Sequence, residues 1–135
     1  MKQLEMIMKT LTNDKSYGKE LILDLHNCDV EKFNKFSLDK FFVELAELTD
    51  MELCKRYWWT MDECPPEWKD IPHLNGISAV QFISTSNFTI HTLTDLKAVY
   101  LNIFTCKDFD QYKAIQFVKE FFAGKVVSTH VIIRK

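Results

Sequence analysis

The second half of the chain carries hydroxyl, imidazole and thiol groups on apolar segments that have the β-branched composition of strands. Ser78 lies in the first of these segments, Ser86 and His91 lie in the second, and Cys106 ends the third. A hydroxyl can act as a nucleophile when a base lies beside it, and an imidazole or a thiol can donate or accept a proton. These four residues are therefore the candidates for catalysis.

A tight hairpin is predicted around the candidate nucleophile. Centred on Thr85 and Ser86, it would set Val80 opposite His91. Ser78 would then be the diagonal neighbour of His91 on the same face, at roughly 7–8 Å between backbone positions. Because Ser86 lies an odd number of residues from His91, it must occupy the turn or a β-bulge to join that face.

A second hairpin is predicted at residues 94–97. It pairs His91 with Tyr100 and returns Cys106 to a position opposite Thr85, beside the first turn. We therefore expect the upstream serine, the histidine and the thiol to converge on the candidate nucleophile. The other face of these strands is apolar and is expected to meet helices, which leaves the polar face for chemistry. The apolar side chains are those of Phe88, Ile90, Val99, Leu101 and Ile103, and Asn102 joins the polar face.

The first half of the chain predicts a strand, a helix and a second strand. Residues 20–25 alternate in hydrophobicity as a strand does, and residues 53–60 predict another strand. Ser37 is the expected N-cap of the helix between them, because apolar residues at helical spacing follow it. Those apolar residues are Leu38, Phe41, Phe42, Leu45 and Leu48. Residues 61–75 contain all three prolines and predict a long loop.

The second half predicts four strands and one helix. Strands are expected at residues 76–83, 88–93, 98–105 and 125–133. The helix is capped near Asp108 or Asp110 and stops at Gly124. Its apolar face is formed by Ile115, Val118, Phe121 and Phe122. Together these elements predict a single α+β domain, an antiparallel sheet with helices packed on one face as a two-layer sandwich.

Length, charge and cysteine content narrow the classes of function. A chain of 135 residues matches one domain that can bury its own core. The net charge of −2, with scattered Lys and Arg, gives no footprint for nucleic acid or for an anionic membrane. The four cysteines form no CxxC pair and no zinc-binding spacing, so reduced thiols and no metal site are expected. Residues 1–9 contain an acidic residue in a very short apolar run, which argues against a signal peptide and favours a cytoplasmic protein.

Around the candidate residues, the sequence resembles the small bacterial and archaeal S-adenosylmethionine decarboxylases. Residues 18–29 are similar to the opening strand of this family. The segments Gly76-Ile77-Ser78, 86–92 and Phe104-Thr105-Cys106 match its motifs in order and spacing. The resemblance runs from about residue 18 to the end of the chain, and it implies the α+β fold of that family.

The resemblance implies a self-processing enzyme with a pyruvoyl cofactor. The Ser86 hydroxyl would attack the carbonyl carbon of Thr85, and β-elimination followed by hydrolysis would leave a ketone at the new N-terminus. The chain would thereby divide into a β chain of residues 1–85 and an α chain of residues 86–135.

The same resemblance implies roles for the other candidates. Ser78 and His91 assist processing, and His91 takes the α-proton during elimination. Cys106 is the acid of turnover: the pyruvoyl ketone forms a Schiff base with the substrate amine, carbon dioxide leaves, and a proton must return. A thiol suits this task because a reference pKa of about 8.5 leaves it mostly protonated at neutral pH. A homodimer with each active site at the junction of two protomers is also implied, as is a place in spermidine and other polyamine synthesis.

Departures from the family motifs bear on processing and on the substrate. Thr85 stands where the family usually has Glu, before the cleaved serine. Leu93-Thr94-Asp95 stands where typical members have Trp-Pro-Glu, so Leu93 and Asp95 are the candidate substrate-binding residues.

S-adenosylmethionine is the first expected substrate, and ornithine or arginine, which relatives of this fold decarboxylate with the same cofactor, is the second. A third possibility is a non-catalytic partner subunit that activates a paralogue without cleaving itself. The aromatic run 57–59 is interpreted as core or dimer interface rather than as a purine-stacking surface.

Overall fold

The computed structural model describes residues 16–135, and this part of the chain forms six strands and two α-helices. The strands are β1 (Gly18–His26), β2 (Leu53–Trp59), β3 (Gly76–Ile83), β4 (Ser86–Leu93), β5 (Ala98–Thr105) and β6 (Lys125–Arg134). The α-helices are α2 (Lys35–Thr49) and α3 (Gln111–Phe122), and 3₁₀ helices span Val30–Lys32, Met61–Glu63 and Pro66–Asp70. No helix among the described residues is long and apolar enough to cross a membrane. Residues 1–9, which bear on the predicted absence of a signal peptide, lie outside the described residues.

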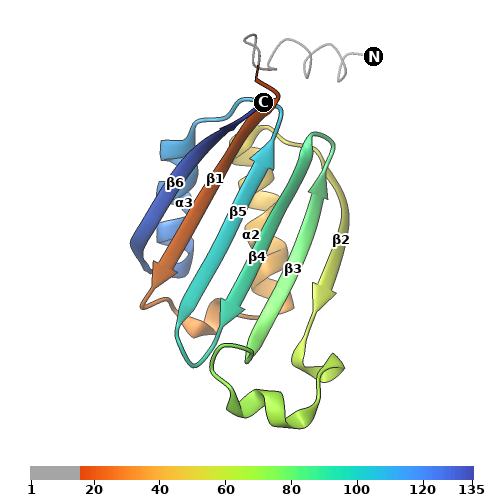
Figure 1. The fold of residues 1–135 in the computed structure, drawn as a ribbon, viewed down its shortest axis with the longest axis vertical. Coiled ribbons are helices and arrows are strands. Elements are labelled where there is room, and N and C mark those ends of the chain that lie inside the picture. The colour runs from red at the N-terminus through yellow and green to blue at the C-terminus, as the bar shows by residue number, and fades with distance from the viewer. Residues whose placement is uncertain (1–15) are drawn as a thin grey trace.

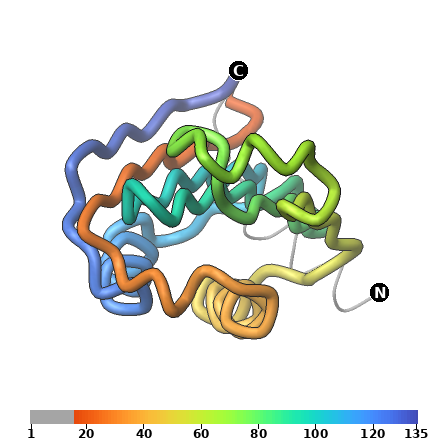
Figure 2. The backbone as a smooth tube through the Cα atoms, turned by 90° about the horizontal axis from the view of Figure 1, so that it is seen from below, coloured from red at the N-terminus to blue at the C-terminus, as the bar shows by residue number. Residues whose placement is uncertain are grey.

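All six strands join one antiparallel sheet in the order β2-β3-β4-β5-β1-β6. Both α-helices cover the same face of this sheet (Figures 1 and 2). We call the opposite side, which the helices leave open, the outer face. The predicted fold, an antiparallel sheet with helices packed on one face, is confirmed.

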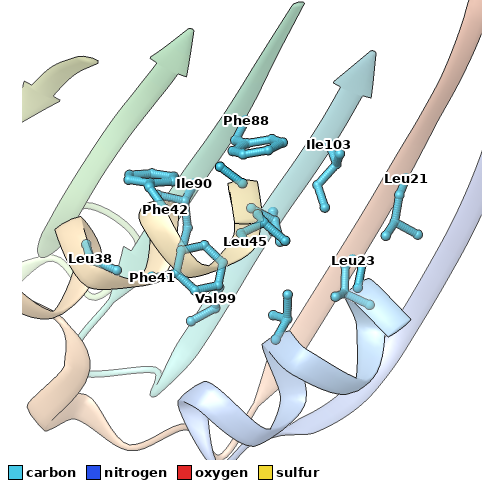
Figure 3. Packing of buried hydrophobic residues seen from close by; sticks show 14 of the residues in the cluster. Leu21, Leu23, Leu38, Phe41, Phe42, Leu45, Phe88, Ile90, Val99 and Ile103 are labelled. Atoms are coloured by element: carbon cyan, nitrogen blue, oxygen red, sulfur yellow. The ribbon is translucent and has the colours of Figure 1, made fainter. Parts of the chain in front are cut away.

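The core lies between the helices and the inner face of the sheet (Figure 3). All five strand residues predicted for the apolar face are buried: Phe88, Ile90, Val99, Leu101 and Ile103. In α2 the prediction is wrong for Leu48, whose exposed fraction is 42%. The buried stripe follows Phe41, Leu45 and Thr49 at four-residue spacing, which turns Leu48 toward solvent. In α3, Val118 and Phe122 are buried as predicted, and Ile115 and Phe121 pack partly buried against the core.

The helix ends are set by polar caps and left-handed residues. Asn34, rather than the predicted Ser37, caps α2: the Asn34 side-chain oxygen accepts a hydrogen bond from the Ser37 backbone N–H at 2.8 Å. Asn and Ser are both favoured N-cap residues, so residue type alone does not choose between them. At α3 the predicted cap Asp110 accepts two backbone N–H bonds from the first turn. The helix ends at the left-handed Ala123, with a φ of 48°, and Gly124 follows.

The register of the first hairpin differs from the prediction by two residues. The turn consists of Ser84 and Thr85 alone, so Ser78 rather than Val80 lies directly opposite His91. Because side chains alternate with a period of two, a shift of two residues leaves each of them on its predicted face. The second hairpin has the predicted register, with His91 opposite its expected partner on β5.

The predicted long loop between β2 and β3 contains two 3₁₀ helices. Figure 2 shows this segment, in light green, on the side of the sheet that faces away from the α-helices. It therefore adds side chains to the outer face at the end of the sheet where β4 finishes (Figure 1).

Candidate active site

The Thr85–Ser86 peptide bond lies where the first hairpin turn enters β4. Tight two-residue turns favour a positive φ at a turn residue. Neither Ser84 nor Thr85 has one, and the positive φ falls on Ser86 instead, at 154°. Non-glycine residues rarely adopt this region, so the peptide bond predicted to be cleaved is followed by a strained residue. The expectation that Ser86 occupies the turn or a bulge is wrong, because it pairs in regular register with Ile83 and Thr105.

Thr85 is held by hydrogen bonds at both its backbone and its side chain. Its carbonyl oxygen accepts a hydrogen bond from the Cys106 backbone N–H at 3.2 Å. Its buried hydroxyl accepts from the Thr105 hydroxyl at 2.7 Å and lies 3.5 Å from the Met51 sulfur. Attack by Ser86 would place negative charge on the Thr85 carbonyl oxygen. The Cys106 N–H is positioned to stabilise that charge.

Cys106 lies just beyond β5, opposite the turn, as predicted. Burial raises the pKa of Tyr17 above the ordinary value for a phenol, and interaction with the Cys106 thiol acts in the same direction. The Tyr17 ring packs on Phe104, with 5.9 Å between ring centroids. Gly18 lets the backbone of β1 approach the end of β5 closely, because a Cβ at this position would lie 2.6 Å from the Cys106 Cα. A phenol that stays protonated at neutral pH can orient the thiol.

Ser78 and His91 form a second polar pair on the outer face. Ser78 Oγ lies 2.8 Å from His91 Nδ1 across the β3–β4 ladder. Ser86, however, is five residues away from His91 along β4, which at about 3.3 Å per residue is on the order of 16 Å. The predicted convergence on Ser86 is therefore wrong within one protomer. Cys106 lies beside the predicted cleavage site, whereas the serine–histidine pair lies farther along the extended strand.

A hollow of about 500 Å³ opens on the outer face beside this pair. Much of its wall is aromatic, with Tyr57 and Trp59 from β2, Tyr100 from β5 and Trp68 from the long loop. Tyr57 and Trp59 are about half exposed, so they belong to the outer face rather than to the core. Among the described residues, neither Asp nor Glu lines the hollow. The hollow thus suits an aromatic or apolar group and offers no carboxylate to a cation.

The two predicted substrate-binding residues are separated. Leu93, at the end of β4, lines the hollow. Asp95 lies in the exposed turn after β4 and does not line it. The Asn75 side-chain amide donates a hydrogen bond to the Asp95 carboxylate at 3.3 Å.

Comparison with known proteins assigns a family to this fold and site. Residues 19–135 match the family described as S-adenosylmethionine decarboxylase. The chain belongs to the S-adenosylmethionine decarboxylase family. The predicted family and the predicted class of enzyme, a carboxy-lyase of this family, are thereby confirmed.

Relatives in this family are moderately similar in sequence. Proteins named S-adenosylmethionine decarboxylase proenzyme from Clostridium botulinum (strain Langeland) and Caldicellulosiruptor saccharolyticus are each 28% identical over 119 residues, or 87% of this chain. The matches cover 93% and 87% of those two proteins. The crystal structure of the adenosylmethionine decarboxylase from Aquifex aeolicus has a TM-score of 0.71 at 17% identity. That comparison covers 90% of this chain and 92% of the other, and it shows a shared fold.

Sequence reasoning missed three residues that border the site. Tyr17 precedes the matched opening strand, and it reaches Cys106 only because β1 pairs with β5. Trp68 lies in the segment predicted as a long loop, where a large aromatic side chain among prolines is a usable signal. Thr105 is visible within a motif, but its contact with Thr85 depends on the second hairpin.

Proposed function

We propose that this chain cleaves itself between Thr85 and Ser86 and then decarboxylates S-adenosylmethionine with the pyruvoyl group formed from Ser86. The observation that carries the proposal is the cleavage site itself. A strained serine follows a buried threonine, and the threonine carbonyl accepts a hydrogen bond from the Cys106 N–H. A ketone in place of Ser86 would fit this position, because it would be half-exposed and close to Cys106. Membership of a family whose members are named proenzymes also supports the proposal.

The cleavage consumes one water and releases ammonia. The Ser86 Oγ bonds to the Thr85 carbonyl carbon as the peptide C–N bond breaks, and the hydroxyl proton passes to the freed nitrogen. Removal of the Ser86 α-proton then expels the Thr85 carboxylate and leaves dehydroalanine. Water hydrolyses the imine tautomer of dehydroalanine, so ammonia leaves and the ketone remains.

A second copy of the chain would complete this site. His91 is the residue proposed to take the α-proton, yet it lies on the order of 16 Å along β4 from Ser86 of its own protomer. Suppose that two copies pack by their outer faces around a two-fold axis, with their β4 strands running in opposite directions. Ser78 and His91 of one copy would then reach Ser86 and Cys106 of the other. The exposed side chain of Phe82, on the same face of β3 as Ser78 and outside the hollow, supplies apolar surface for this homodimer.

In turnover the pyruvoyl carbonyl supplies the electron sink for decarboxylation. Cys106 donates the proton that replaces carbon dioxide, and Tyr17 orients the thiol. The thiol must stay reduced for this role. All four cysteines lie among the described residues and are free, and we propose that the enzyme works in the reducing cytoplasm.

The hollow favours S-adenosylmethionine over ornithine or arginine. A purine stacks on aromatic surface, and a sulfonium is attracted to aromatic faces. Tyr57, Trp59, Trp68 and Tyr100 supply that surface. A basic amino acid would call for a carboxylate opposite its distal cation, and none lines the hollow in the described part of the chain. The basic amino acids therefore remain the second candidates.

Intact mass tests the first half of the proposal. Purified protein should contain fragments of residues 1–85 and 86–135, the second with a ketone in place of its N-terminal amine, and Ser86→Ala should stay whole. A wild-type chain that stays whole after long incubation would contradict self-processing and support a non-catalytic partner subunit.

Release of labelled carbon dioxide tests the second half. Processed protein is offered carboxyl-labelled S-adenosylmethionine, ornithine and arginine in separate reactions, and release is expected from S-adenosylmethionine. Release from an amino acid alone would overturn the proposed substrate while leaving self-processing intact.

A further inference from the structure

Behind the cleavage site, hydrogen bonds run in one direction through two buried threonines. The Lys107 backbone N–H donates to Thr105 Oγ1 at 3.0 Å, and the Thr105 hydroxyl donates to Thr85 Oγ1 at 2.7 Å. The Thr85 hydroxyl in turn donates to the Met51 sulfur at 3.5 Å. The exposed fractions are 0% for Thr105 and 5% for Thr85, so water does not compete for these bonds. Thr105 Oγ1 also lies 3.8 Å from the Met51 sulfur, a longer and weaker alternative to its bond with Thr85.

This chain of hydrogen bonds is anchored to the end of helix α2. The Lys107 ammonium bonds to the backbone carbonyl and the carboxylate of Asp50, the left-handed residue that caps α2. Met51 follows Asp50 directly. The Ser84 backbone N–H also donates to the carbonyl of Glu52 at 3.0 Å. The hairpin turn is thus attached to the helix layer as well as to its own sheet.

We propose that Thr105 is a positioning residue for self-cleavage, acting through Thr85. The inference rests on the self-processing proposed above. A backbone conformation such as that of Ser86 persists only where surrounding contacts hold it. Because Thr85 is fixed at its side chain by Thr105 and at its carbonyl by Cys106, the scissile peptide cannot rotate to relax the strain. The carbonyl stays directed at its N–H donor and ready for attack.

Substitutions at Thr105 separate this role from simple packing. Thr105→Val keeps the shape and removes the hydroxyl, so self-cleavage should slow by roughly 10-fold, the effect of losing about one buried hydrogen bond. Thr105→Ser keeps the hydroxyl and should restore the rate to within about 2-fold of wild type. The decay of the intact chain is followed by mass spectrometry after cell-free synthesis. An equal rate for the valine and wild-type proteins would overturn the proposal.

Thr49→Val is the matched control. Thr49 is also buried, and its hydroxyl donates to the Leu45 carbonyl at 2.7 Å within α2 rather than to Thr85 or Thr105. This variant should lose stability while cleaving at the wild-type rate. If its cleavage slows as much as that of Thr105→Val at equal loss of thermal stability, the effect belongs to general destabilisation and the proposal is wrong.

Two further readouts identify the step and the route. Neutral hydroxylamine splits an ester, so the Thr105→Val chains that have not yet cleaved should stay joined between Thr85 and Ser86 in hydroxylamine, because they are slowed before acyl transfer. Accumulation of an ester that hydroxylamine releases as fragments would place the defect after that step and overturn the proposal.

Thr85→Val should slow cleavage similarly, and the double variant should be no slower than the slower single variant, because both remove the same contact. Additive losses would contradict action through Thr85. A wild-type chain that never cleaves would overturn self-processing itself, and all variants would then remain equally whole.

Discussion

Cys28 and Cys106 carry the same functional group in different surroundings. Cys28 is buried in the core, and this burial raises the pKa of its thiol to about 11, although a backbone hydrogen bond from Val99 acts in the opposite direction. Cys106 lies at the partly exposed end of β5 with the Tyr17 hydroxyl beside it. Of these two thiols, Cys106 is therefore the one that a bound molecule could reach.

The raised pKa of Cys28 predicts a loss of stability at alkaline pH. Above the ordinary thiol pKa of 9.0, the unfolded chain releases this proton while the folded chain keeps it until about pH 11. The contribution of Cys28 to the free energy of unfolding is complete below about pH 9 and is lost progressively between about pH 9 and 11. Urea unfolding across this range should show a steeper decline for wild type than for Cys28→Ala. Parallel declines would contradict the assigned pKa.

Replacing the proposed acid should separate processing from turnover. Cys106→Ala keeps the backbone N–H that bonds to Thr85 and should still cleave itself. Carbon dioxide release should fall by roughly 10²–10⁴-fold, as expected when a general acid is removed. Tyr17→Phe keeps the thiol and should lose less than about 10-fold, as expected for loss of one hydrogen bond. Unchanged release from processed Cys106→Ala would exclude the thiol as the proton donor.

The sequence predicted which side chains are reactive but not the contacts that hold them. Ser78, Ser86, His91 and Cys106 stand out because their types and spacing match a known chemistry. The bond between Thr105 and Thr85 arises from long-range pairing that residue types alone do not determine.

At the scale of elements, the faces of the strands were predictable and one register was not. Alternation assigned Phe88 and Ile90 to the core and His91 to the outer face, and the structure agrees. The predicted register of the first hairpin was wrong by two residues because its turn, Ser84-Thr85, contains no glycine or asparagine to mark the turn position. The separation of His91 from the predicted cleavage site follows from Ser86 belonging to the extended strand β4, whereas the sequence predicts Ser86 in the turn or at a bulge.

The β1–β5 pairing near Cys106 depends on the absence of a side chain at Gly18. A Cβ at Gly18 would lie 2.2 Å from the Thr105 carbonyl oxygen and 2.6 Å from the Cys106 Cα, both backbone atoms. Gly18→Ala should therefore destabilise the fold by roughly 3 kcal/mol, since strands must separate to admit the methyl group.

Gly124→Ala is the control for this substitution. Its added Cβ would chiefly meet the Cys28 sulfur at 2.7 Å, the end of a side chain that can rotate. The loss should be smaller than for Gly18→Ala when both are measured by urea unfolding. The reverse order would show that backbone contact at Gly18 does not limit the β1–β5 approach.

At the scale of the whole molecule, the distance between the two polar groups on β4 predicts complementation between copies. His91→Ala retains Ser86, and Ser86→Ala retains His91. Each alone should remain uncleaved, but mixing them after brief unfolding should give cleavage of the His91→Ala chains, because the partner's histidine completes their site. Mass labelling of one variant identifies which chain is cut. Cleavage that stays absent in the mixture, with mixed dimers formed, would contradict a shared site.

The strand order determines how the processed enzyme must reassemble. Cleavage after Thr85 would leave β1, β2 and β3 on one fragment and β4, β5 and β6 on the other. Since β1 lies between β5 and β6, the fragments interlock within one sheet and cannot part without breaking the ladders on both sides of β1. Folding before cleavage is a reaction of one chain, whereas refolding afterwards requires an encounter of two. Recovery of processed protein from urea should therefore rise with protein concentration and should include a second-order phase. Uncleaved Ser86→Ala should fold its protomer without such a phase. Concentration-independent recovery would contradict this. Self-cleavage would thus make refolding of the protomer depend on protein concentration.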